Sequence, residues 1–172
     1  APAPAPTGAK SPSKRITIEP SNYSGNYKLG DFKWEIELEI KKDPPLGERT
    51  LWIFNDNTEK RLTPESGGGN ASIRIYNKHG THSEYPRAAG ITTGSLSKKS
   101  YGGFQTLEDK VYLNGALSTA KEVIDEDLTN IYELLILGNY FKVKYSATST
   151  TDHTIGTNIF KVGNAVKQYI MN

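Results

Sequence analysis

Hydrophobic and polar residues alternate along residues 33–41 with a period of two. The apolar members of this series are Trp34, Ile36, Leu38 and Ile40. Such alternation predicts a β-strand with one buried and one solvated face. The prolines at positions 44 and 45 would end this strand, because proline cannot donate a hydrogen bond to a strand ladder. The next run, Arg49–Phe54, shows no alternation, which predicts a central strand covered on both faces.

The second half of the chain carries two further patterns. Apolar residues recur at intervals of three and four from Leu107 to Leu137. This spacing predicts helix, with Gly115 and the acidic residues 125–127 as positions where it could divide in two. Tyr140–Ala147 alternates in the manner of a strand, and a short helix over Asn164–Ile170 is expected to close the chain.

Two segments, residues 71–76 and 86–93, fit either strands or irregular chain. With the segments around them, the order is strand, glycine-rich loop, long helix, strand, loop and terminal helix. This order predicts an α/β domain, in which ligands bind beyond the carboxyl ends of the central strands.

Length and composition predict one folded domain after a linker. The chain has 172 residues, enough for one domain with a substantial core. Residues 1–15 contain four prolines and no apolar side chain larger than alanine or proline, which predicts an extended spacer without packing of its own. We interpret it as a linker to another domain or an anchor, with an expression remnant or the start of an exported protein as the alternatives. The domain itself is expected over residues 16–172.

Composition also excludes several classes of chemistry. The chain has no cysteine, which excludes disulfides, thiolate metal sites and cysteine nucleophiles. No segment approaches the ~20 apolar residues that cross a bilayer, so a soluble protein without a membrane span is expected. The net charge is +2, of which residues 1–15 contribute +3, so the remainder carries −1. A nearly neutral domain is not expected to bind nucleic acids generally.

Three segments have residues suited to a nucleotide. The first joins Asn55, Asp56 and Asn57, at the end of the apolar strand, to Gly67, Gly68, Gly69 and Asn70. Amide side chains can bind sugar hydroxyls, and glycine N–H groups can bind anionic oxygens. A flexible surface loop is the alternative.

The second and third segments are less specific. The second contains Thr92, Thr93 and Gly94 among small residues, and a tight bend between strands would look the same. The third is a long loop that contains Gly156, Thr157, Asn158 and Phe160. Its backbone amides could contact a diphosphate and Phe160 could cover a ribose or base. Structureless loops of this length are uncommon in compact domains unless they are functional.

Other polar residues are weaker candidates. His79, His82 and Glu84 could be metal ligands, but Gly80 disrupts the helical geometry that would align them. Asp152 and His153 are better placed for acid–base chemistry, beside the third segment. No metal or cofactor is therefore expected.

Together these segments resemble those of the macro domain, an ADP-ribose-binding module. In that family a strand enters an Asn-Ala-Ala-Asn turn, followed by a Gly-Gly-Gly loop, a small-residue segment with threonine and glycine, and a late Gly-x-Gly loop. The resemblance covers residues 49–172, and only the glycine loop is close to the family pattern. Asp56 replaces a small residue, Asn158 replaces the second glycine, and Gly30-Asp31 is a poor match to the Gly-Asp that binds adenine.

The resemblance implies a three-layer α/β domain with a central mixed sheet flanked by helices. It implies that Asn57 contacts the distal ribose, that residues 67–70 lie beside it, and that residues 156–160 hold the diphosphate. In hydrolytic members, water attacks the anomeric carbon with help from asparagine and the substrate phosphate, which makes Asn57 and Asp56 the catalytic candidates. The expected partner is ADP-ribose, a related nucleotide diphosphate or an ADP-ribosylated molecule. The alternative is a structural or protein-interaction module.

Overall fold

The computed structural model of the chain describes residues 15–22, 30–80, 85–95, 102–113, 115–148, 151–156 and 162–172. Its elements are β1 (Thr17–Asn22), α1 (Gly30–Lys42), β2 (Arg49–Asn57), the 3-10 helix η2 (Gly69–Tyr76), β3 (Ala88–Ser95), β4 (Gly102–Gly103), β5 (Lys110–Leu113), β6 (Ala116–Thr119), α2 (Ala120–Ile136), β7 (Tyr140–Ala147) and α3 (Asn164–Met171). All but one residue of the linker expected over residues 1–15 lies outside the described part.

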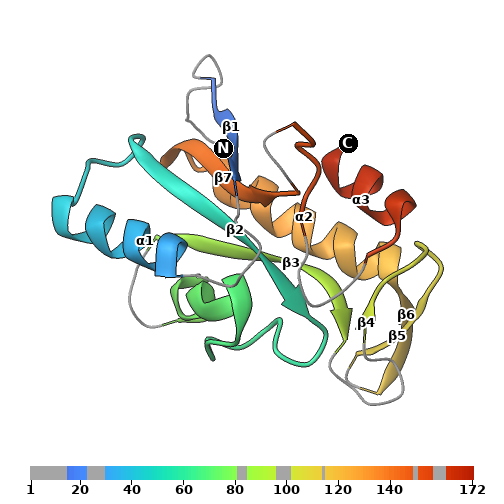
Figure 1. The fold of residues 1–172 in the computed structure, drawn as a ribbon. Helices are drawn as coiled ribbons and strands as arrows, with labels where there is room; N and C mark the ends of the chain where they lie inside the picture. Colours follow the sequence, from blue (N-terminus) through green and yellow to red (C-terminus); the bar gives the residue numbers. More distant parts are fainter. Residues whose placement is uncertain are drawn as a thin grey trace, which may run out of the picture.

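A mixed five-stranded sheet runs through the centre of the domain in the order β1-β7-β2-β3-β4 (Figure 1). The first four strands are parallel and β4 is antiparallel to β3. Strands β5 and β6 form a separate hairpin. The α/β fold with a central mixed sheet and flanking helices is therefore confirmed, and the carboxyl ends of β1, β7, β2 and β3 share one edge of the sheet.

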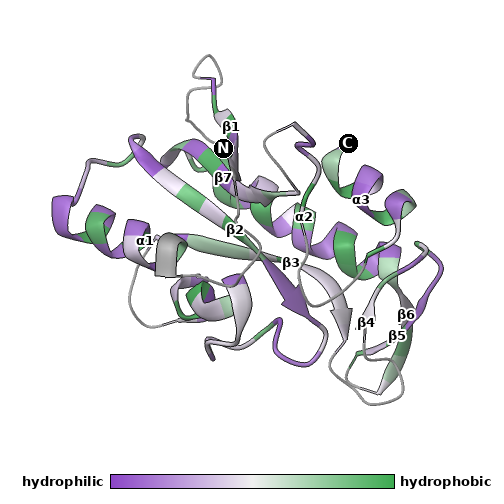
Figure 2. Ribbon diagram, in the orientation of Figure 1, coloured by the Kyte–Doolittle hydropathy of each residue, from purple (hydrophilic) through white to green (hydrophobic). Residues whose placement is uncertain are grey.

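Strand β2 is buried on both faces, as its apolar run predicts. Leu51 and Ile53 belong to one core cluster, which also contains residues of α2 and α3. Trp52 and Phe54 belong to a second cluster, with residues of α1 and η2. Figure 2 shows that the strand becomes hydrophilic at its carboxyl end. The core therefore ends where the candidate polar residues begin.

Residues 33–41 form most of helix α1, so the strand predicted from their alternation is wrong. Phe32 and Ile36, four residues apart, are buried against the sheet, whereas Trp34 is 62% exposed. Glutamate, leucine and lysine favour helix in this segment. Glu39 also anchors the helix, because its carboxylate accepts hydrogen bonds from the Thr50 backbone N–H (2.9 Å) and from Arg87 (3.2 Å).

The helix predicted from Leu107 is confirmed only from Ala120 onward. Residues 110–113 and 116–119 instead pair as the β5–β6 hairpin, and Gly115 has φ +81°. The start of α2 is set by a capping box, in which Thr119 and Glu122 satisfy each other's backbone N–H groups. This Thr-x-x-Glu pattern is a sequence signal that marks the true start of the helix.

Strand β7 and helix α3 are confirmed, residues 86–93 lie largely in β3, and residues 71–76 belong to η2 rather than to a strand. Among the described helices, none combines the length and apolar character needed to cross a membrane.

A buried ion pair joins η2 to the end of β2. The guanidinium of Arg74 donates from Nε and Nη2 to Asp56 Oδ1, at 2.9 and 2.6 Å, and from Nη1 to the Glu65 carbonyl at 2.7 Å. Both side chains are at most 3% exposed. Burial is the main effect on the pKa of Asp56 and raises it, while Arg74 opposes the rise. The two groups therefore depend on each other for solvation.

We predict that Arg74→Met lowers the free energy of unfolding by about 3–5 kcal/mol, because it leaves the Asp56 carboxylate buried without its partner. Urea unfolding at neutral pH, followed by circular dichroism, measures the loss. Adding Asp56→Asn should recover part of it, since the buried charge is then removed. A loss below about 1 kcal/mol in the single variant would show that the pair is not the constraint described here.

Candidate ligand site at the carboxyl edge of the sheet

The carboxyl ends of β2, β3 and β7 bring chain segments that are distant in sequence to one edge. Strand β2 ends at Asn57, which is level with Gly94 of β3, and β7 ends at Ala147. Because neighbouring parallel strands all deliver their following loops to the same edge, this is where α/β proteins most often bind ligands. The candidate residues of the sequence analysis follow or lie within these strand ends.

Asn55 connects the first and third candidate segments. Its backbone N–H donates to Asn70 Oδ1 at 2.9 Å, and Asn70 Nδ2 donates back to Asn55 Oδ1 at 3.1 Å. Asn55 Nδ2 also donates to the Gly156 carbonyl at 2.8 Å. The structure thus places residues 55, 70 and 156 together, and fixes both amide side chains by bonds within the protein.

The three consecutive glycines have different surroundings. A Cβ on Gly67 would lie 3.0 Å from Arg74 Nη1, and Gly69 has φ +68°, which favours glycine. Gly68 has φ −79° and ψ 167°, and a Cβ there would meet no atom within 4 Å. Contact with Arg74 therefore favours glycine at position 67 and the backbone conformation favours it at position 69, but neither reason applies to Gly68.

Asp56 and Asn57 occupy unlike positions. The carboxylate of Asp56 is held by Arg74 and by the Asn57 backbone N–H, which donates at 2.8 Å. Asn57 Oδ1 accepts from the Lys60 backbone N–H at 2.9 Å. Its Nδ2 has no acceptor within the described residues, and the side chain is largely buried. Of the two catalytic candidates, Asn57 has the uncommitted donor.

The threonines of the second segment are completely buried and contact other protein groups. The Thr92 backbone N–H donates to Asp127 Oδ2 at 2.7 Å, and its hydroxyl accepts from Arg61 Nε at 3.3 Å. Thr93 Oγ1 donates weakly to the Asp56 carbonyl at 3.5 Å. Gly94 accepts a hydrogen bond from the Thr58 N–H at 3.1 Å. These residues shape the strand end from within the fold.

The third segment is described only in part. Gly156 donates its N–H to the Ser146 carbonyl at 2.8 Å, and a Cβ at this position would lie 2.9 Å from the Ala147 carbonyl oxygen. Thr157, Asn158 and Phe160 lie outside the described residues. Asp152 and His153 are exposed beside this loop. Hydrogen bonds from Thr154 lower the pKa of Asp152.

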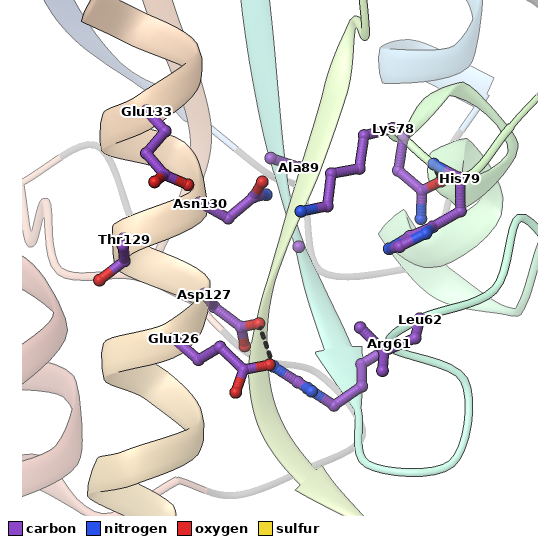
Figure 3. Close-up of a pocket in the computed structure, with 12 residues that line it drawn as sticks. Arg61, Leu62, Lys78, His79, Ala89, Glu126, Asp127, Thr129, Asn130 and Glu133 are labelled. Carbon is purple, nitrogen blue, oxygen red and sulfur yellow. Dashed lines mark hydrogen bonds and ion pairs between the residues drawn. The ribbon is translucent and has the colours of Figure 1, made fainter.

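A cavity of about 320 Å³ lies beside β3, between α2 and the segment that follows η2 (Figure 3). Its residues are Arg61, Leu62, Asn77, Lys78, His79, Ala89, Gly90, Glu126, Asp127, Thr129, Asn130 and Glu133. Arg61 bridges one end of it, where Nη2 donates to Asp127 at 2.8 Å and to Glu126 at 2.9 Å. The sequence does not reveal this cavity, because its residues come from segments that only the fold brings together.

Among the described residues, the cavity has no group of side chains arranged to bind a metal ion. His79 lies in the cavity wall. Burial, and to a smaller extent the positive charge of Lys78, lowers the pKa of its imidazole. His82 and Glu84, the other metal candidates, lie outside the described residues. In the described ranges, no three histidine, cysteine, aspartate or glutamate side chains gather as a metal site.

Comparison of the chain with models of protein families, with curated proteins and with solved structures finds no match.

We predict that Asn70→Ala lowers the free energy of unfolding by about 1–3 kcal/mol, because it removes the acceptor of the partly buried Asn55 N–H. Urea unfolding measures this change. Ser66→Ala serves as the control, because Ser66 is exposed and donates one hydrogen bond to the Ser72 carbonyl. Equal losses in the two variants would mean that the Asn55–Asn70 pair has no special role in holding the edge together.

Proposed function

We propose that the carboxyl edge of the sheet binds ADP-ribose or a related nucleotide diphosphate through the backbone of residues 67–70. The observation that carries this proposal is Gly68. Its side-chain-free position is not required by the conformation or packing of the protein. A close approach of the backbone to a ligand is the other common reason for a glycine.

The position of Gly68 suits an anion. It precedes η2, whose first N–H groups have no partner within the helix. The N–H groups of Gly68 and Gly69 have no acceptor among the residues that the structure describes. Exposed N–H groups at the start of a helix favour phosphate oxygens by hydrogen bonding and by the helix dipole. The diphosphate is the part of the ligand that these groups would bind.

Asn57 supports recognition of the sugar. Its Nδ2 donor lies at the carboxyl end of β2, which is the strand that also positions Asn55 against Asn70 and Gly156. A ribose hydroxyl would supply the missing acceptor. The macro-domain resemblance assigns the distal ribose to the same residue, so two separate arguments lead to Asn57.

Binding, rather than hydrolysis, is the activity that the geometry favours. Asp56 is committed to Arg74 in a buried ion pair, which argues against a role as a general base. Removal of ADP-ribose from a modified molecule would therefore depend on Asn57 and on the phosphates of the substrate. A non-enzymatic interaction module remains the alternative function.

We predict that Gly68→Val abolishes binding of ADP-ribose measured by calorimetry, because the valine side chain would occupy the space of the phosphate. The change should alter the free energy of unfolding by only about 0.5 kcal/mol, since the site is exposed and its backbone suits valine. Glu48→Val, at the opposite edge of the sheet, is the matched control and should bind normally. Undiminished binding by Gly68→Val, or none by the unaltered chain, would refute the proposal.

A second prediction separates the sugar from the phosphates. Asn57→Ala should weaken ADP-ribose at least about tenfold, a loss of about 1.4 kcal/mol, because the distal ribose loses its donor. AMP lacks that ribose and should lose far less. Parallel calorimetric titrations give the comparison. Equal losses for both nucleotides would place Asn57 away from the distal ribose.

A further inference from the structure

Strand β3 has an open side along most of its length. It pairs with β2 from Ala88 onward, but β4 pairs only with its last residues, Gly94 and Ser95. Phe104, which follows β4, also donates its N–H to the Thr93 carbonyl at 2.9 Å. Among the described strands, none therefore lies beyond β3 at residues 88–92. Open strand edges present unpaired N–H and C=O groups to any extended chain that can reach them.

The hydrogen bonds of β3 show which groups face outward. Trp52 donates its N–H to the Arg87 carbonyl at 2.8 Å, so residue 87 faces β2. The Thr92 N–H faces the other way and donates to Asp127 at 2.7 Å. Main-chain groups alternate in direction along a strand, so Gly90 faces outward like Thr92. No described residue pairs with its N–H or C=O.

The cavity of about 320 Å³ lies along this open side, with Ala89 and Gly90 among its lining residues. Figure 3 shows α2 on one side of β3 and the segment carrying Lys78 and His79 on the other. The Arg61–Asp127 ion pair lies at the end nearer Thr92. The cavity is therefore a slot beside a strand edge.

The two walls of the slot have opposite charge. Helix α2 contributes the acidic residues Glu126, Asp127 and Glu133, and the opposite wall contributes the basic residue Lys78. The single guanidinium of Arg61 forms ion pairs with both Glu126 and Asp127, so Glu133 is the carboxylate of this wall without an ion pair among the described residues. Lys78 and Glu133 have no charged partner within the described part of the chain, and Figure 3 shows both side chains directed toward the cavity.

We propose that this slot binds an extended peptide segment of a partner protein, which adds a strand to the open side of β3. The peptide backbone would pair with the N–H and C=O of Gly90, in the manner of β-strand addition. Successive side chains of a strand point to opposite faces of the sheet. A basic side chain would face Glu133 on α2, and the neighbouring acidic side chain would face Lys78.

The length of the site fixes the size of the peptide. The open stretch before the Thr92–Asp127 hydrogen bond covers residues 88–91, and four residues of a strand span about 13 Å. A bound segment therefore needs about four residues in contact with the edge, with adjacent lysine and glutamate at its centre. This inference concerns the side of β3 and does not depend on the nucleotide site at the end of the strand.

Fluorescence anisotropy with labelled hexapeptides tests the proposal. The probe has the sequence Val-Thr-Lys-Glu-Thr-Val, and the controls replace its central pair by Lys-Lys or Glu-Glu. The mixed pair should bind about fivefold more tightly than either control, as complementary charge pairs beside a strand allow. N-methylation of both central amides should weaken the probe at least about tenfold, because one of these two N–H groups faces β3 in either register and must pair with it.

Charge reversal in the walls provides the matched variants. Lys78→Glu should shift the preference to the Lys-Lys peptide, because both walls are then acidic, and Glu133→Lys should shift it to the Glu-Glu peptide. Lys110→Glu, at an exposed residue of β5 outside the cavity, should leave the preference unchanged. All these residues are exposed, so the variants should fold. Failure of the mixed peptide to bind, equal binding of the N-methylated peptide, or an unchanged preference in Lys78→Glu would overturn the proposal.

Discussion

The ion pair between Asp56 and Arg74 is the constraint on which both candidate sites depend. It fixes the carboxyl end of β2 to η2, and the third donor of Arg74 holds the Glu65 carbonyl immediately before the glycines. The same pair limits what can lie beside it, because a Cβ on Gly90 would come within 2.7 Å of Asp56 Oδ2. This buried ion pair thus fixes the chain just before the glycine loop and leaves no room for a side chain at Gly90 of β3.

Sequence patterns predicted the elements whose burial is governed by hydrophobic contact. Strand β2 is apolar on both faces because two helical layers cover it, and the pattern of its residues reports this directly. Helix α1 was missed because carboxylates help to dock it. Glu35 accepts from Trp52 Nε1 at 3.0 Å and from Lys144 Nζ at 2.8 Å. The spacing of hydrophobic residues cannot predict these polar contacts, because the residues that pair with Glu35 are remote in sequence.

The candidate site was predictable to the extent that chain order determines which strand ends are neighbours. Asn55 and Gly156 come together because β2 and β7 are parallel neighbours, whereas Asn70 joins them from η2. The sequence could not reveal that Asp56 is paired, because an arginine inside a short apolar segment resembles an exposed charge until its partner is known. The slot beside β3 was equally hidden. The edge of β3 is open because β4 is only two residues long and pairs only with Gly94 and Ser95. The sequence does not show how short this pairing is.

Glycines can be assigned to folding or to ligand binding by asking what a Cβ would meet. A Cβ added to Gly67, Gly90 or Gly156 would lie within about 3 Å of other protein atoms, so packing accounts for these three glycines. Gly69 is accounted for by its positive φ. Gly68 belongs to neither group, and replacing it would leave contacts inside the protein unchanged. Gly68 also lies next to N–H groups that have no acceptor among the described residues, and the proposed ligand site rests on this combination.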